Sequence, residues 1–149
     1  MVIRMKVKNI VDEALKYWND NHNCAQSTAS GSLDYFGFED ESKTLRKAYL
    51  PYGGGVGERT ICGSLLGALA AISFLLMEKG LPNEQIYEKI KILKQGFNEA
   101  NGSMYCKELL HDFIDSDGIL DIDNPDRKKI CDKSVETAVL IVKDLVEKT

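Results

Sequence analysis

Residues 61–77 read ICGSLLGALAAISFLLM and contain no charged side chain. A helix that is apolar on nearly every side belongs in the interior of a helical bundle, where neighbouring helices cover it. The stretch is also close to the minimum length for crossing a bilayer. Its glycine, serine and cysteine residues lower its hydrophobicity, so we expect no membrane insertion and predict instead a buried central helix that begins near Cys62.

The segments on both sides of this stretch have the periodicity of amphipathic helices. The clearest lie at residues 7–19, 24–36 and 83–100 and after Asn124, with shorter, more polar ones at residues 42–50 and around Cys106. Strand-like alternation is weak and limited to Ile3, Met5 and Val7. The sequence therefore predicts an all-α, single-domain bundle of five to six helices around the central one.

The length, charge and N-terminal sequence exclude several classes of protein. A chain of 149 residues fits one domain, 1–149, whose core needs no disulfides for stability, and we expect residues 1–6 to be a loosely ordered extension. No apolar run followed by a cleavage site occurs near Met1, so we expect a cytoplasmic protein with reduced thiols. A net charge of −4 with scattered lysines and arginines argues against nucleic-acid binding.

Four cysteines lie far apart in the chain, at Cys24, Cys62, Cys106 and Cys131. The first three fall in the first turns of predicted helices, where unpaired N–H groups and a partial positive charge favour a thiolate. Cys131 falls on the apolar stripe of the last helix, so we expect it to face the core. Because the core does not depend on disulfides, we predict a chemical role for these thiols and expect them to gather near one end of the bundle.

Glycines surround Cys62 on both sides. Residues 53–57 read GGGVG, and Gly63, Gly67 and Ala71 recur every four residues in the central helix. Glycine inside a helix costs roughly 1 kcal/mol relative to alanine, which indicates a close contact with a neighbouring backbone or a ligand. The loop is not followed by the Gly-Lys-Ser/Thr of one phosphate-binding motif, and it lacks the last glycine of the dinucleotide-binding motif. The glycines that we expect to shape a site are Gly53, Gly54, Gly55, Gly57, Gly63 and Gly67.

The order of these motifs is similar to that of a known family. Cys24 in Asn-Cys-Ala-Gln, the glycine loop, Cys62-Gly63-Ser64-x-x-Gly67, Cys106-Lys-Glu-Leu and Cys131 resemble the C_GCAxxG_C_C family over roughly residues 8 to 145. Ser64 stands where the family usually has alanine. The family is described as redox-active proteins, so the resemblance implies redox chemistry at these cysteines but names no reaction or substrate.

Thiol–disulfide chemistry is the first of three hypotheses. Cys62 would attack, because of its helix start, its glycine surroundings and the nearby charge of Arg59. Cys24 or Cys106 would resolve the mixed disulfide, and Cys131 would be an accessory thiol or a member of another pair. This chemistry needs no cofactor, and the partner would be a redox protein or a small thiol or disulfide.

Two other hypotheses remain open from the sequence. One is metal binding, in which a zinc ion or an iron–sulfur cluster would be held by the thiolates of Cys24, Cys62, Cys106 and Cys131. Such sites usually draw two ligands from one tight loop, which this sequence lacks. The other is a non-catalytic interaction module, in which the cysteines have no chemical role. The sequence decides neither the pairing of the thiols nor the substrate nor the oligomeric state.

Overall fold

The structure is a computed structural model that describes residues 8–149. The predicted N-terminal extension and the alternation from Ile3 to Val7 therefore lie outside the described residues. The first helix begins at Ile10, later than the predicted start at Val7, because the Asn9 side chain caps it. Helices dominate the rest, and residues 8–149 contain no strand, only two isolated bridges between extended residues. The all-α prediction is confirmed.

Seven α-helices form in the described part of the chain, among them the short one predicted around Cys106, and three short turns come in addition to the predicted helices. They are α1 (Ile10–Trp18), α2 (Cys24–Tyr35), α3 (Glu39–Ala48), α4 (Gly63–Glu78), α5 (Asn83–Asn101), α6 (Cys106–Leu109) and α7 (Pro125–Glu147). Short helical turns lie at η1 (Leu50–Tyr52), η2 (Gly55–Arg59) and η3 (His111–Phe113).

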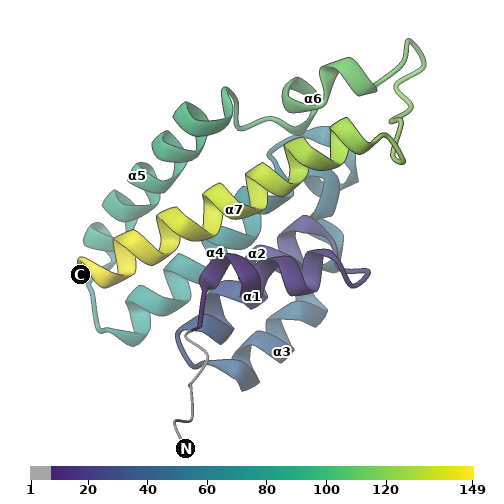
Figure 1. Ribbon diagram of the computed structural model, residues 1–149. Coiled ribbons are helices and arrows are strands. Elements are labelled where there is room, and N and C mark those ends of the chain that lie inside the picture. Colours follow the sequence, from purple (N-terminus) through teal and green to yellow (C-terminus); the bar gives the residue numbers. More distant parts are fainter. Residues whose placement is uncertain (1–7) are drawn as a thin grey trace, which may run out of the picture.

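Helix α4 is the predicted central helix, and its apolar side chains form the middle of the main core. Leu65, Ile72 and Leu76 of α4 pack with Phe97 of α5 and Val142 of α7. Figure 1 shows the long α7 crossing in front of α4 and α2, with α5 beside it. None of the helices within residues 8–149 has both the length and the hydrophobicity to cross a membrane.

Helix α2 is a second buried helix, although its sequence is polar. Every residue from 25 to 34 is buried. Ser27 Oγ donates to Asn23 O at 2.7 Å and Thr28 Oγ1 donates to Ser64 O at 2.8 Å. The buried hydroxyls of Ser30 and Ser32 have no hydrogen-bond partner among the described residues. Small side chains also let neighbouring helices approach closely, and α2 packs against α1, α3, α4 and α7.

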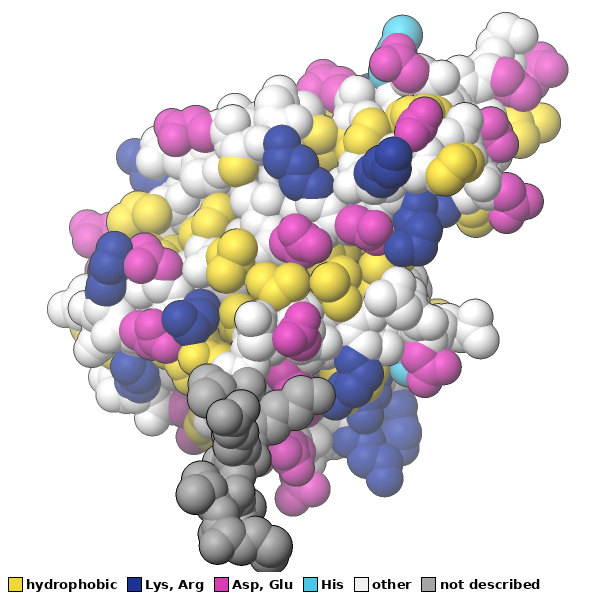
Figure 2. All heavy atoms as spheres, viewed as in Figure 1, with side chains coloured by type: hydrophobic (Ala, Val, Ile, Leu, Met, Phe, Trp, Pro, Cys, Tyr) yellow, Lys and Arg dark blue, Asp and Glu magenta, His cyan; other side chains and the backbone are white. Residues whose placement is uncertain are grey.

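Helices α1 and α7 share a smaller core of their own. Ile10 and Ala14 of α1 pack against Val135 and Val139 of α7, and all four are buried. On the face seen in Figure 2, hydrophobic side chains lie between these two helices, with charged side chains on either side. This contact fixes α1 over the first half of α7.

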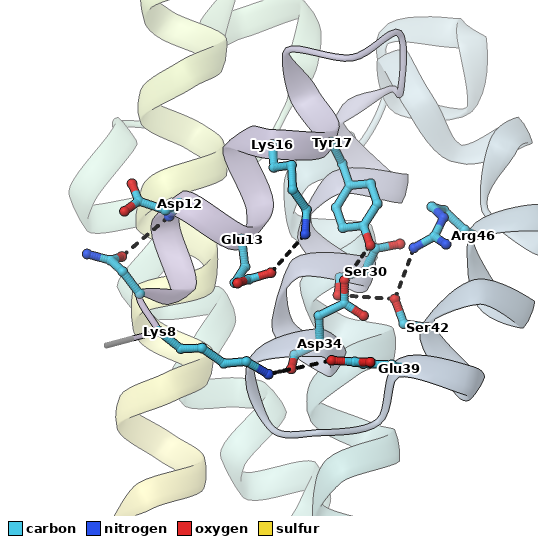
Figure 3. A network of polar contacts seen from close by, with 11 residues as sticks. Lys8, Asp12, Glu13, Lys16, Tyr17, Ser30, Asp34, Glu39, Ser42 and Arg46 are labelled. Carbon is cyan, nitrogen blue, oxygen red and sulfur yellow. Dashed lines mark hydrogen bonds and ion pairs between the residues drawn. The ribbon is translucent and has the colours of Figure 1, made fainter. Parts of the chain in front are cut away.

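A polar network connects α1, α2 and α3 (Figure 3). The Tyr17 hydroxyl donates a hydrogen bond to the carboxylate of the buried Asp34, and the Arg46 guanidinium lies 4.5 Å from the centre of the Tyr17 ring. Arg46 also donates to Ser42 Oγ at 3.2 Å. Lys8 donates to the backbone carbonyl of Asp34 at 3.1 Å. The network therefore holds the outer helices against α2.

Replacement of Tyr17 by phenylalanine tests this network. The substitution removes a hydrogen bond to a buried carboxylate, so we expect the free energy of unfolding to fall by about 1.5–3 kcal/mol. Urea denaturation at neutral pH measures it. The matched control is Tyr87→Phe on α5, where the side chain is 71% exposed and the change should be within about 0.5 kcal/mol. Equal effects at both positions would contradict the role of Tyr17.

Candidate functional site

All four cysteines line one cavity of about 200 Å³, where the beginnings of α2, α4, α6 and α7 meet. Apart from these thiols and a few polar groups, the wall is apolar. Its large apolar side chains are Trp18, Leu109, Leu110, Leu120, Ile122 and Ile130. Of the glycines singled out in the sequence, Gly54 and Gly63 line the cavity and Gly53, Gly55, Gly57 and Gly67 do not.

Cys24 is placed by a strong helix start. Asn23 and Gln26 form a capping box, in which each side chain accepts a hydrogen bond from the backbone N–H of the other residue. The Cys24 sulfur then lies directly over Gly63, where an added Cβ would be 2.3 Å from it. One turn later, a Cβ at Gly67 would be 2.2 Å from the Ala25 carbonyl oxygen. The repeated glycines therefore let α2 approach α4 at the cavity.

Cys62 and Cys106 come together through a short antiparallel pairing. The Cys62 N–H donates to Met104 O and the Cys106 N–H donates to Thr60 O, both at 2.7 Å. Ile61 and Tyr105 form the bridge between these bonds. Because alternate residues of an extended segment face opposite sides, the two cysteines share one face as diagonal neighbours. Both of their own N–H groups are used by carbonyls, so neither is free to stabilise a thiolate.

Two arginines act on thiols in the cavity. The charge of Arg59 lowers the pKa of Cys106 against the effect of burial, whereas the sequence led us to expect its charge at Cys62. Arg127, which sequence analysis missed, lies with its Nη1 atom 3.6 Å from the Cys131 sulfur. Arg127 precedes Cys131 by four residues on the same helix, and residues at this spacing are neighbours on a helix surface. This spacing could have predicted the contact.

Burial raises the pKa values of three thiols, contrary to the thiolate expected at helix starts. Desolvation, followed by the charge of Cys62, raises the pKa of Cys24 to about 12, against an opposing hydrogen bond from the Gly54 backbone. Burial also raises the pKa of Cys106 and that of Cys131, and the adjacent arginines oppose this effect. The charge of Cys62 is among the causes in all three cases, so Cys62 lies near each of the other thiols.

The positions of these side chains were also compared with the needs of a metal ion. Within residues 8–149, no three His, Cys, Asp or Glu side chains are grouped so that they could hold one ion. Metal binding by all four cysteines stays a prediction from the sequence.

The model of the family described as "Putative redox-active protein (C_GCAxxG_C_C)" matches residues 22–145. The chain belongs to this family. The matched range contains all four cysteines and both arginines of the cavity. No curated protein and no solved structure shows significant similarity to the chain.

Ser64, at the position where alanine is usual in the C_GCAxxG_C_C family, has a partner in this chain. Its side chain is fully buried, and its Oγ atom lies 2.8 Å from Ser134 Oγ. Ser134 donates its own proton to Cys131 O at 2.7 Å, so Ser64 is the donor between the two serines. The hydroxyl pair thus connects the start of α4 to the α7 turn that holds Cys131.

The two serines should respond differently to substitution. Ser134→Ala leaves the buried Ser64 hydroxyl without an acceptor, so we expect a loss of about 1–3 kcal/mol in the free energy of unfolding. Ser64→Ala removes the donor and leaves Ser134 bonded to Cys131, so the loss should be smaller, about 1 kcal/mol. Urea denaturation of both variants and of the double variant measures the coupling. Strictly additive losses would contradict the pairing.

The raised pKa of Cys24 predicts a pH dependence of stability. Below pH 9.0 the thiol is protonated in both states, and between pH 9.0 and about 12 the unfolded chain releases the proton first. The reduced protein should therefore lose stability across this range, and Cys24→Ala should lose less. Denaturation at about pH 8 and about pH 10.5 compares the two. Equal losses of stability in the wild type and in Cys24→Ala between these two pH values would contradict a raised pKa of Cys24.

Proposed function

We propose that this protein is a thiol–disulfide redox protein in which Cys62 is the attacking thiol. The observation that carries the proposal is the cavity in which Cys62 lies among the other three cysteines of a redox-active family. A thiol that neighbours several others can form a mixed disulfide with a partner and then pass it to a second thiol. This chemistry requires no cofactor.

Cys106 is the favoured second thiol, and Cys24 is the alternative. Cys106 shares a face with Cys62 on the paired segments and lies near the charge of Arg59, which stabilises the thiolate needed for the second attack. Burial raises the pKa of Cys24 to about 12, which makes its deprotonation costly. Cys131 contacts Arg127 and serves as an accessory thiol.

The reaction begins when Cys62 loses its proton and its sulfur attacks one sulfur of a partner disulfide. The partner's S–S bond breaks, a mixed disulfide forms with Cys62, and the first partner thiolate leaves. Cys106 then loses its proton and attacks the Cys62 sulfur, which releases the second partner thiolate. Two cysteine thiols are oxidised to one disulfide, and the partner gains two electrons and two protons.

A reducing compartment such as the cytoplasm suits this cycle, because the disulfide formed in the protein is returned to two thiols there. The partner is a redox protein or a small disulfide. Both assignments follow from the proposed chemistry.

Native mass spectrometry of protein purified without oxygen or chelator is the first test. We expect no metal adduct and, after treatment with the neutral disulfide 4,4′-dithiodipyridine, the loss of the mass of two hydrogen atoms. Dithiothreitol should reverse this loss. Peptide mapping should then find Cys62 joined to Cys106.

Serine variants provide the controls. Cys62→Ser should form no such intramolecular disulfide, and Cys131→Ser should form it as the wild type does. Full formation in Cys62→Ser would refute the central role of Cys62. A zinc or iron–sulfur adduct that each cysteine variant loses would replace this proposal with the metal hypothesis. If the protein forms no disulfide and carries no metal, the interaction module is the hypothesis that remains.

A further inference from the structure

Two guanidinium groups face the thiol cavity, and no carboxylate lines it. Arg59 and Arg127 are among the lining residues, whereas no aspartate or glutamate is. In the part of the chain that the structure describes, neither arginine takes part in an ion pair. The cavity is therefore positively charged when its thiols are protonated.

The Arg127 side chain is held in place but only partly satisfied. Its Nη1 atom contacts the Cys131 sulfur and its Nη2 atom donates to Ile122 O at 2.5 Å. The Nε atom is buried and has no hydrogen-bond partner among the described residues. A buried N–H of a charged group without an acceptor is costly. With no carboxylate in the cavity lining, the charge of Arg127 is left without a counterion there.

The acidic residue next to Cys131 on α7 is already engaged elsewhere. Asp132 follows Cys131, and its carboxylate accepts hydrogen bonds from Trp18 Nε1 at 2.5 Å and from Lys128 Nζ at 3.0 Å. These contacts occupy the carboxylate outside the cavity lining. Neutralisation of the two arginines is thus left to the thiols or to a bound anion.

The glycine loop is shaped around Arg59. The backbone of Arg59 is left-handed, with φ of 59°, and its Nη1 atom lies where a Cβ on Gly54 would be only 2.8 Å away. Gly54 itself has a left-handed backbone with φ of 63°, a conformation that glycine adopts more easily than other residues. The loop therefore leaves room for this guanidinium to lie against it at the cavity wall.

We propose that the thiol cavity binds a small substrate with one anionic group, a carboxylate or another oxyanion, next to an apolar body, and that Arg59 and Arg127 bind the anion. The inference rests on the proposed function in one respect, since the bound molecule is the disulfide or thiol that exchanges with Cys62. The fork of a guanidinium matches the geometry of a carboxylate, and an apolar wall strengthens such a pair. A volume of about 200 Å³ is below that of drug-sized pockets, so the substrate is small.

Binding of benzoate and benzamide tests the anion site without redox chemistry. The two probes share a ring and differ in charge, and Trp18, the one tryptophan of the chain, lines the cavity and reports binding by fluorescence. In the reduced protein we expect benzoate to bind at least about tenfold more tightly than benzamide, the effect of one charge-assisted hydrogen bond. Equal affinities would overturn the inference.

Three charge variants assign the effect. Arg59→Gln and Arg127→Gln should each reduce the preference for benzoate and leave benzamide binding unchanged. Lys133→Gln, which removes one charge from an exposed position on α7, should keep the preference. A similar loss in Lys133→Gln would show a general charge effect and overturn the site. Arg59→Gln keeps the test valid if Arg127→Gln does not fold, because Arg59 lies on the loop.

Oxidation rates separate the anion site from the proposed function. The ratio of the oxidation rate with anionic 5,5′-dithiobis(2-nitrobenzoate) to the rate with neutral 4,4′-dithiodipyridine should fall in Arg59→Gln and stay at the wild-type value in Lys133→Gln. Loss of the Arg59 charge at Cys106 slows both reagents and cancels in this ratio. Disulfide formation without any anion preference would overturn this inference and leave the redox function. Tighter binding of benzoate than of benzamide without disulfide formation would keep the anion site and overturn the redox function.

Discussion

The rest of the structure depends on the close approach of α2 to α4 beside the cavity. Gly63 and Gly67 carry no side chain where the Cys24 sulfur and the Ala25 carbonyl lie, so the two helices contact each other through backbone and small atoms. Thr28 Oγ1 donates to Ser64 O at 2.8 Å across the same contact. Any larger residue at either glycine would separate the helices and move Cys24 away from Cys62. The helix-destabilising cost of glycine is offset by this packing.

The start of α4 positions the other two thiols as well, through two hydrogen bonds each. Cys106 is held by the paired segments on either side of Ile61, and Cys131 is held through the hydrogen bonds that join Ser64 to Ser134. Segments that are far apart in the chain therefore meet at residues 60–64. This arrangement explains how a cavity can collect four cysteines without any closely spaced pair in the sequence.

Sequence patterns predicted the features that depend on local periodicity and small residues. The apolar run from Ile61 predicted the central helix, and the periodicity of residues 24–36 predicted the helix that begins at Cys24. The burial of α2 was not predicted, because its serines and its threonine read as polar. Only the fold shows that Ser27 and Thr28 bond to backbone carbonyls, and that small side chains let the neighbouring helices cover the rest. The effect of the Arg59 charge on Cys106 depends on a pairing between distant segments, which no local pattern contains.

The electrostatics of the cavity come from side chains more than from helix ends. The N–H groups of Cys62 and Cys106 are bonded to carbonyls, and α6 has only four residues, so its dipole is small. Burial raises the pKa values of Cys24, Cys106 and Cys131, which keeps these three thiols protonated at neutral pH. Positive charge from Arg59 and Arg127 is then the main local force that favours a thiolate at Cys106 or Cys131. The same two guanidinium groups would hold an anionic substrate, so substrate binding and thiol ionisation draw on one pair of charges and must be coupled.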